Sequence, residues 1–145
     1  MSDRVYCYPP DFTVLKNKFD LRDAEALAVA ERAAVVARMM QEIPDGAFDL
    51  AHLQAIHHHL FQDVYDWAGD VRQVEIAKGE QQFPPRRFIE TGMADIHRRL
   101  LNSDFLEGIT PDEFARQAGR IIGDLNYVHP FREGNVSFRG RPSFV

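Results

Sequence analysis

The sequence predicts one mostly α-helical domain of 145 residues, interrupted by a single short β-hairpin. Three observations predict this all-α fold class. Several stretches repeat apolar residues at every third or fourth position, which is the spacing of one helix face. Residues 71–83 include Val74 and Ile76, which alternate with polar residues before a Lys78-Gly79 turn, as in a hairpin. Apolar residues make up 45% of the chain and charged residues 27%, the balance of a packed globular protein.

The net charge and the single cysteine narrow the classes of function. A net charge of -5 repels a phosphate backbone, so no nucleic-acid partner is expected. Cys7 has no second cysteine with which to pair, which favours a reducing, cytoplasmic location over a disulfide-stabilised secreted fold. Neither a signal peptide nor a membrane-spanning apolar run is recognised, so no membrane partner is expected.

Two helices are predicted in the first half of the chain. Residues 1–22 contain two prolines and are expected to form an irregular arm, after which Asp23 is placed to cap a helix. Pro44 and Gly46 end that helix, and Asp49 is placed to cap a second one. The predicted buried faces consist of Leu27, Ala30, Ala34 and Ala37 in the first helix, and of Leu50, Leu53, His57, Leu60 and Val64 along the second stripe.

Three consecutive histidines, His57 to His59, raise the question of a metal site. Adjacent residues of a helix point about 100° apart, so three in a row do not converge on one ion. These histidines are therefore expected at ordinary solvated or half-buried helix positions.

Two more helices follow the hairpin. Pro85 is placed to open the third helix, while Thr110, Pro111 and Glu113 carry the capping signals of the fourth. The predicted buried faces consist of Ile89, Met93, Ile96 and Leu100 in the third helix, and of Phe114, Ala118, Ile121 and Leu125 in the fourth.

The fourth helix runs directly into "NYVHPFREGN", where Pro130 disfavours the α conformation at His129 and should end the helix there. A loop histidine titrates near neutrality and suits the removal of a hydroxyl proton. Glu133 is a hard oxygen ligand of the kind that Mg²⁺ prefers. Gly134 lets backbone N–H groups approach an anion closely, and Asn135 adds an amide donor. Together these residues predict a base, a metal ligand and a phosphate cradle, although each alone also fits an ordinary loop.

Several motifs resemble those of the Fic family. "HPFREGN" at residues 129–135 is similar to its signature loop, in which Phe131 is expected to anchor the loop on the core. "YCYPPDFTVLKNKF" resembles the family's tyrosine-proline opening, "LFQDVYDWAGDVR" its Asp-Trp-Ala-Gly segment, and "VEIAKGEQQF" its flap hairpin. The resemblance implies an all-α Fic-type helical bundle with the flap at residues 71–83. It also implies an enzyme that moves AMP from ATP to a Ser, Thr or Tyr hydroxyl of a target protein.

The resemblance assigns a role to each matching residue. His129 would activate the target hydroxyl, and Glu133 would hold the Mg²⁺ that bridges the α- and β-phosphates of ATP. Gly134 and Asn135 would line the anion hole. The Lys78-Gly79 pair would belong to a flap that covers the nucleotide and pairs with the target backbone as an added strand.

The tail, residues 136–145, departs from the family pattern of a glycine and two arginines at the start of a long helix. Val136, Ser137 and Gly140 stand at those three positions, and Gly140 and Pro142 interrupt any helix. By this resemblance, the C-terminal helices of the family are expected to be missing. Lost charge-assisted hydrogen bonds are worth roughly 1.5–3 kcal/mol each, so activity is expected to be weak or lost.

Three functions are compatible with these motifs. The first is a protein adenylyltransferase that acts as the toxin of a toxin–antitoxin-like pair. "SDFLEG" at residues 103–108 fits the letters of the family's inhibitory helix, but its place between two predicted helices favours a loop at Glu107 and a separate antitoxin protein. The second is a truncated, non-catalytic Fic remnant that binds an antitoxin or a target. The third keeps the transferase chemistry with a different nucleotide or donor.

Overall fold

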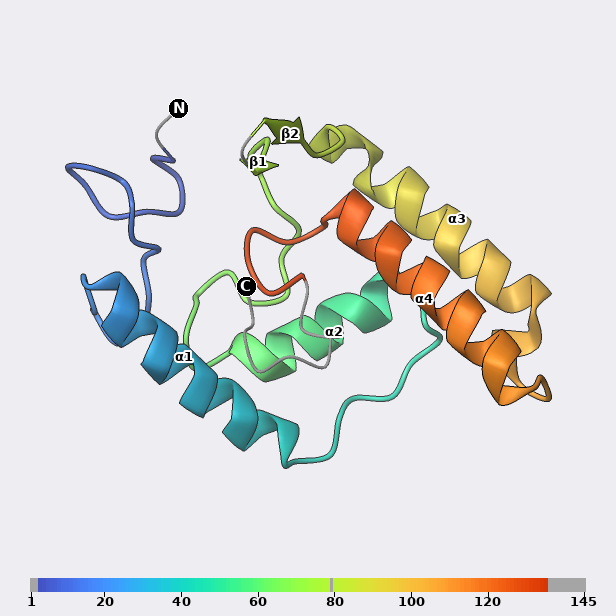
Figure 1. Cartoon of the computed structure of the whole chain (residues 1–145). Helices are drawn as coiled ribbons and strands as arrows, with labels where there is room; N and C mark the ends of the chain where they lie inside the picture. The colour runs from blue at the N-terminus through green and yellow to red at the C-terminus, as the bar shows by residue number, and fades with distance from the viewer. Residues whose placement is uncertain (1–2, 79, 136–145) are drawn as a thin grey trace. The chain divides into compact units, whose positions relative to one another are not determined.

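The predicted all-α fold with one short hairpin is confirmed in the computed structural model, which describes residues 3–78 and 80–135 (Figure 1). In these residues the α-helices are α1 (Ala24–Met39), α2 (Leu50–Phe61), α3 (Ile89–Asn102) and α4 (Pro111–Val128). The hairpin consists of β1 (Ala77–Lys78) and β2 (Gln81–Gln82), and two 3₁₀ turns are η1 (Arg86–Phe88) and η2 (Asp104–Leu106).

Contacts along the chain divide the described residues into two compact units. Unit 1 lies within Met1–Asp45 and Gln54–Asp70, and unit 2 lies within Gly46–Leu53 and Val71–Val145. The single domain expected from the chain length stays a prediction. Across the described residues, none of the helices combines the length and the apolar character that a bilayer crossing requires.

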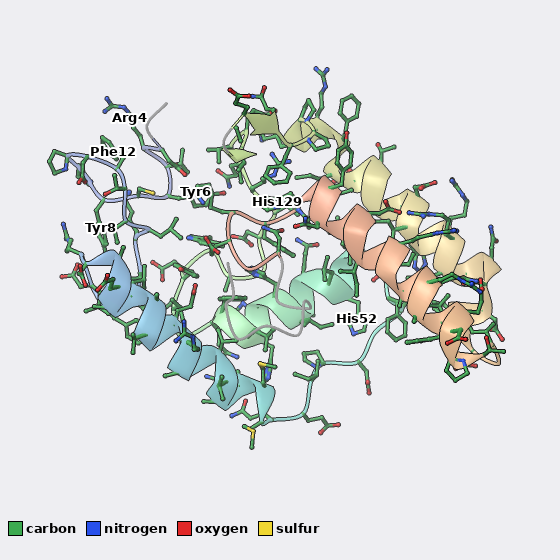
Figure 2. All side chains as sticks on the ribbon, viewed as in Figure 1. Arg4, Tyr6, Tyr8, Phe12, His52 and His129 are labelled. Atoms are coloured by element: carbon green, nitrogen blue, oxygen red, sulfur yellow. The ribbon has the colours of Figure 1, made fainter. Side chains whose placement is uncertain are left out.

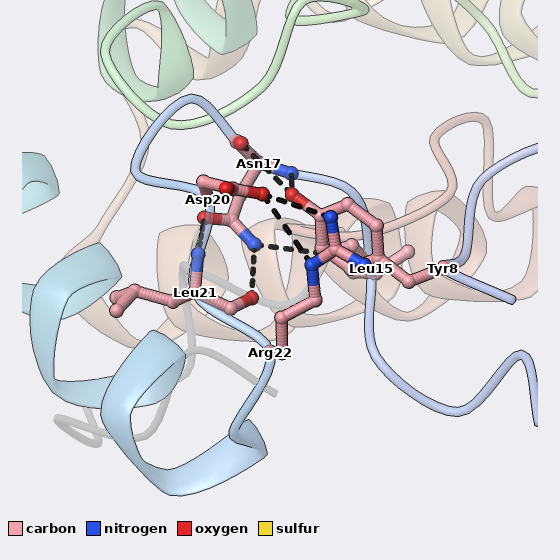
Figure 3. A network of polar contacts seen from close by, with 6 residues as sticks. All are labelled: Tyr8, Leu15, Asn17, Asp20, Leu21 and Arg22. Carbon is pink, nitrogen blue, oxygen red and sulfur yellow. Dashed lines mark hydrogen bonds and ion pairs between the residues drawn. The ribbon is translucent and has the colours of Figure 1, made fainter.

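In unit 1 the N-terminal arm is irregular, as predicted, but the side chain of Asn17 ties it together (Figure 3). Its amide nitrogen donates to the carbonyl oxygens of Leu15 and Leu21 at 2.9 and 2.8 Å. Its amide oxygen accepts the backbone N–H of Leu21 at 3.0 Å. The Arg22 guanidinium lies 3.9 Å from the centre of the Tyr8 ring, a cation–π contact that also fixes the arm.

The buried face of α1 differs from the predicted one. Leu27, Glu31 and Val35 are buried at a spacing of four, whereas Ala37 is exposed. Glu31 belongs to this face because its carboxylate accepts a hydrogen bond of 2.6 Å from the Tyr65 hydroxyl. A buried carboxylate needs such a partner, which apolar periodicity does not reveal.

An ion pair joins α1 to the turn after α2. Two nitrogens of Arg38 donate to the two carboxylate oxygens of Asp63, at 2.7 and 2.8 Å. These hydrogen bonds lower the pKa of Asp63 and raise the pKa of Arg38.

Helix α2 begins at its predicted cap, because a carboxylate oxygen of Asp49 accepts the N–H of His52 at 2.9 Å. Its three histidines contact three different groups. Nδ1 of His57 accepts the N–H of Gly69 at 2.9 Å, whereas Nδ1 of His58 lies 3.0 Å from the Ala68 carbonyl oxygen. Nε2 of the third, His59, lies 2.9 Å from the Arg38 carbonyl oxygen.

In unit 2, α3 and α4 run antiparallel and side by side (Figure 1). The predicted stripe of α3 is confirmed, since Ile89, Met93 and Ile96 form its buried core. The α-helix itself begins four residues after Pro85, because the turn η1 intervenes. The partly buried residues packed against this core are Leu50, Leu53, Val71, Leu100, Ile121, Leu125 and Val128.

Helix α4 starts at the predicted cap, with Thr110 Oγ1 accepting the N–H of Glu113 at 3.2 Å. Phe114 was expected on the buried face but is 51% exposed. Its exposure follows from helix length: α3 has 14 residues and α4 has 18. Because Arg99 near the end of α3 pairs with Asp124 at 2.7 Å, the first turns of α4 extend past the end of α3.

In the segment that resembles an inhibitory helix, Glu107 lies in a loop, as predicted, directly after the 3₁₀ turn η2. Asp104, Phe105 and Leu106 have left-handed φ angles of 52°, 54° and 62°. Glu107 follows in an extended conformation with φ -78° and ψ 148°.

A glycine inside α3 permits close packing against α4. A Cβ atom added at Gly92 would lie 2.8 Å from Cγ2 of Val128, a β-branched side chain with little freedom to move. Gly92→Ala is therefore expected to lower the melting temperature, although alanine normally favours a helix. Gly123→Ala is the matched control, because nothing lies within 4 Å of a Cβ atom there. That control should gain roughly 0.5–1 kcal/mol in the free energy of unfolding. Equal gains for both variants would contradict the close contact.

The Arg38–Asp63 pair predicts a dependence of stability on pH. A carboxyl group whose pKa is lowered by folding stabilises the fold above its usual pKa of about 3.9. This contribution is lost as the pH falls through the lowered pKa of Asp63. Asp63→Asn should therefore reduce the urea midpoint at neutral pH, and its difference from the native chain should shrink in acid. The exposed Asp45→Asn variant serves as control, and a pH-independent difference would refute the assignment.

Candidate active site

His129 stands at the C-terminal end of α4, where the helix ends as predicted (Figure 2). Its backbone N–H still donates to the Leu125 carbonyl oxygen at 2.9 Å, but its φ and ψ angles are 52° and 63°. This left-handed conformation, which the sequence did not predict, costs a non-glycine residue roughly 1–2 kcal/mol. Other contacts must therefore hold His129 in place.

The loop after His129 is closed by its own residues. Phe131 is only 2% exposed, which confirms its predicted role as the anchor of the loop. The Asn135 amide oxygen accepts the N–H of Phe131 at 2.8 Å, and the Asn135 amide nitrogen donates to the Phe131 carbonyl oxygen at 2.5 Å. Gly134 has φ 81°, a region in which other residues are strained.

The imidazole of His129 stacks on the ring of Phe83, just after the hairpin. The ring centres lie 4.0 Å apart and the planes differ by 14°. Phe83 is itself held by the hairpin, because its N–H donates to the Ile76 carbonyl oxygen at 3.0 Å. The stack restricts the rotation of the imidazole, which is half-buried.

Arg72, whose side chain is fully buried, contacts both the hairpin and the histidine loop. Nε of Arg72 donates to the carbonyl oxygen of His129 at 2.6 Å. The backbone N–H of Arg72 donates to the carbonyl oxygen of Pro130 at 2.8 Å. On the hairpin side, Nη1 donates to the carbonyl oxygen of Val74 at 2.9 Å and Nη2 to that of Pro84 at 2.7 Å.

The positive charge of Arg72 is balanced by the carbonyl groups at the C-terminal end of α4 and by the carboxylate of Glu75. The last carbonyl groups of a helix have no partners within it and carry a partial negative charge. Arg72 also donates to the Val128 carbonyl oxygen at 3.4 Å, and its guanidinium lies 3.8 Å from the Glu75 carboxylate. Since α4 has no basic residue in its own last turn, Arg72 supplies the missing cation from elsewhere in the chain.

The predicted site residues are distributed over two segments. His129, Glu133, Gly134 and Asn135 lie together in one loop, and the backbone of Lys78 lies in β1 opposite Gln81. The remaining positions that the sequence singled out, namely Gly79, Val136, Ser137 and Gly140, lie outside the described residues.

Sequence reasoning missed Arg72 and Phe83. Arg72 lies in the "DWAGDVR" stretch, where nothing in the apolar spacing distinguishes a buried arginine from a surface one. Phe83 could have been identified more easily from the sequence, because a large aromatic residue directly after a hairpin of polar residues is unusual unless its ring is covered.

The donor set suits a magnesium ion that is shared with phosphates. Mg²⁺ is usually bound by one or two carboxylates together with substrate phosphates and water. Glu133, which is half-buried in the loop, is one such carboxylate. Groups of three or more His, Cys, Asp or Glu residues suited to a metal ion do not occur among residues 3–78 and 80–135, so a metal cage made by protein alone is not found there.

Comparisons with known proteins agree with this arrangement. The model of the Fic/DOC family matches residues 47–137. The chain is 38% identical to a probable protein adenylyltransferase, y4lH, of Sinorhizobium fredii over 130 residues, which cover 89% of this chain and 67% of that protein. It is 37% identical over 129 residues to the protein adenylyltransferase VbhT of Bartonella schoenbuchensis, covering 87% of this chain and 27% of VbhT.

A solved structure has the same fold. The crystal structure of the effector BepC from Bartonella tribocorum, with bound AMPPNP, superimposes with a TM-score of 0.79 at 28% identity. The match covers 90% of this chain and 70% of the BepC chain.

Phe83→Leu tests the stack on His129. Protons of an imidazole that lies over an aromatic face are shielded, so loss of the ring should move the His129 imidazole NMR signals downfield. Phe88→Leu is the matched control, because Phe88 is 48% exposed and lies on η1. Unchanged His129 signals in Phe83→Leu would show that the stack does not exist in solution.

Proposed function

Because the chain belongs to the Fic/DOC family, we propose that it is a protein adenylyltransferase that moves AMP from ATP to a Ser, Thr or Tyr hydroxyl of a target protein. The observation that carries this proposal is the placement of a histidine, a carboxylate and a glycine-asparagine pair in one closed loop. The relatives y4lH and VbhT are named as a probable protein adenylyltransferase and a protein adenylyltransferase, respectively, which supports the reaction class. The AMPPNP bound to BepC supports ATP as co-substrate.

In the proposed reaction the hydroxyl oxygen of the target attacks the α-phosphorus of ATP. The bond between the α-phosphorus and its bridging oxygen to the β-phosphate breaks, and pyrophosphate leaves. His129 takes the proton from the attacking hydroxyl. Since Nδ1 of His129 is buried, Nε2 is assigned as the nitrogen that accepts this proton.

Glu133 is proposed to hold Mg²⁺, which when bound would neutralise the phosphate charges. Gly134 and Asn135 are proposed to face the phosphates through their backbone N–H groups, because the Asn135 side chain closes the loop. The positive φ of Gly134 supports this role, since successive N–H groups converge in such turns.

The β1–β2 hairpin is proposed to receive the target as an added strand. Each strand has only two residues, paired Ala77 with Gln82 and Lys78 with Gln81. An edge strand leaves backbone N–H and C=O groups available for a partner, and main-chain pairing positions a hydroxyl without requiring one sequence. We propose that Lys78 and Gly79, which match the family's flap in sequence, contact the nucleotide.

We further propose that the protein is the toxin of a toxin–antitoxin-like pair and acts in the cytoplasm. Cys7 is the single cysteine of the sequence, so the chain forms no disulfide within itself, which suits a reducing compartment. The loop conformation at Glu107 supports a separate antitoxin protein, because an inhibitory helix would need helical backbone there.

The rival function is a non-catalytic module that binds an antitoxin or a target. It is favoured by Val136 and Ser137, which replace the family's glycine and first arginine. A donor other than ATP is the third candidate and is favoured by the same two residues.

Incubation of the purified chain with labelled ATP and a cell lysate tests the proposal. His129→Ala should lower the labelling of protein by about 10²–10⁴-fold, because a general base contributes that much to a proton transfer. His58→Ala is the matched control, since His58 is exposed and lies in α2. Labelling retained in His129→Ala would refute the mechanism. No labelling by the native chain, with Mg·ATP bound in calorimetry, would favour the binding module.

Glu133→Gln tests the metal assignment. Glutamine keeps the size of the side chain but removes the charge that a hard cation prefers. The Mg²⁺ concentration that gives half-maximal labelling should therefore rise, roughly ten-fold if one charge-assisted contact of about 1.4 kcal/mol is lost. Glu107→Gln, in the loop before α4, should leave the titration unchanged. An identical titration for Glu133→Gln would remove Glu133 from the metal site.

A further inference from the structure

We propose that Arg72 is a positioning residue that holds the hairpin and the histidine loop as one rigid body. The inference rests on the proposed function, in which the hairpin receives the target and His129 takes its proton. The inference identifies Arg72 as the residue that fixes the distance between the hairpin and His129. Arg72 itself touches neither the target nor ATP in this proposal.

On the loop side, Arg72 is bonded to three successive carbonyl groups. Those of Val128 and His129 accept from the guanidinium at 3.4 and 2.6 Å, and that of Pro130 accepts from the Arg72 backbone at 2.8 Å. Three fixed carbonyl groups determine the direction of the backbone on both sides of His129. The left-handed conformation of His129 is thereby held by contacts outside its own helix.

On the hairpin side, Arg72 is bonded to both flanks. Val74 precedes β1 and Pro84 follows β2, and their carbonyl groups accept from the two terminal nitrogens at 2.9 and 2.7 Å. Glu75 also connects Arg72 to the segment after the hairpin. Its carboxylate lies 3.8 Å from the Arg72 guanidinium and accepts the backbone N–H of Arg86 at 3.0 Å. One side chain thus closes the base of the hairpin.

The geometry requires a guanidinium. Its donors are fixed in one plane and point in different directions, so it bonds acceptors on opposite sides at once. A lysine ammonium is a point charge with three donors at a single atom. Lysine at position 72 would therefore keep the buried charge and lose the bonds to one of the two segments.

Native-state hydrogen exchange on the unmodified chain tests the rigid body directly. If Arg72 joins the segments, the N–H groups of Arg72, Phe83 and Phe131 should open with the same free energy and the same denaturant dependence. These groups bond to Pro130, Ile76 and Asn135 respectively. Opening of the loop at lower free energy, while the hairpin stays protected, would overturn the proposal.

Arg72→Lys provides the second test, with Arg38→Lys as the matched control in unit 1. In Arg72→Lys, protection should fall in the hairpin and the loop together, while α1 and α3 keep theirs. In Arg38→Lys neither segment should change. Uniform loss of protection across all helices would show that Arg72 is only a core residue, and unchanged protection would show that it joins nothing.

The kinetic readout separates positioning from binding. Labelling by Arg72→Lys at saturating ATP should fall at least about ten-fold, because a misplaced reacting group loses rate, while KM for ATP changes less than about three-fold. A rise in KM without a fall in kcat would overturn the positioning role. If the native chain labels nothing, the proposed function fails, whereas the exchange experiments still decide whether Arg72 joins the two segments.

Discussion

The hydrogen bonds of the buried Arg72 guanidinium are the interaction on which the rest of the site depends. A cation without solvent is costly unless it is fully paired, and here backbone carbonyl groups and one carboxylate surround it. Hydrogen bonds to charged groups contribute roughly 1.5–3 kcal/mol each, and a buried carbonyl left unpaired costs a similar amount. Burial of the Arg72 cation and burial of its carbonyl acceptors are therefore each favourable only when the other group is present. The loop and the hairpin are held by the same bonds.

This mutual dependence explains how a strained histidine persists. The left-handed backbone of His129 is unfavourable by itself, yet it directs the residue out of α4 and into a loop. The bond from Arg72 to its carbonyl and the stack on Phe83 each oppose relaxation of this conformation. Strain that is held by surrounding contacts is typical of functional sites. Here these holding contacts come from Arg72 and Phe83, at the two ends of the hairpin, so His129 is positioned relative to the hairpin as well as to its own helix.

The sequence predicted the elements well because their signals are local. Caps at Asp23, Asp49 and Thr110 depend on residues three positions away, and all three are found. The apolar stripes of α2 and α3 are likewise confirmed. The errors occur where a distant partner decides burial. Glu31 is buried by its hydrogen bond from Tyr65, and no spacing within α1 encodes that pairing.

The same limit applied to the site. Its loop residues His129 to Asn135 are contiguous, so one motif identified them, whereas Arg72 lies 57 residues before His129 and acts through backbone carbonyl groups. Carbonyl groups are present at every residue and leave no signature in the sequence. At Phe114 the helical period was correct, but the predicted burial was wrong, because α3 ends before it reaches this residue. Local periodicity describes a helix, while the partner's length decides which part of it is covered.

Backbone contacts also bear on the choice of target. In the proposed function, a hairpin that pairs with the target through its main chain would accept many sequences, so discrimination would come from where the hydroxyl lies relative to His129. That placement depends on the hairpin's separation from His129, which is set by the carbonyl groups of Val74, Pro84 and His129 around one guanidinium. In the proposed site, this geometry would select among target hydroxyls, as side-chain pockets do in other enzymes. Changes at the base of the hairpin would then alter which hydroxyls react without changing any residue that touches the target.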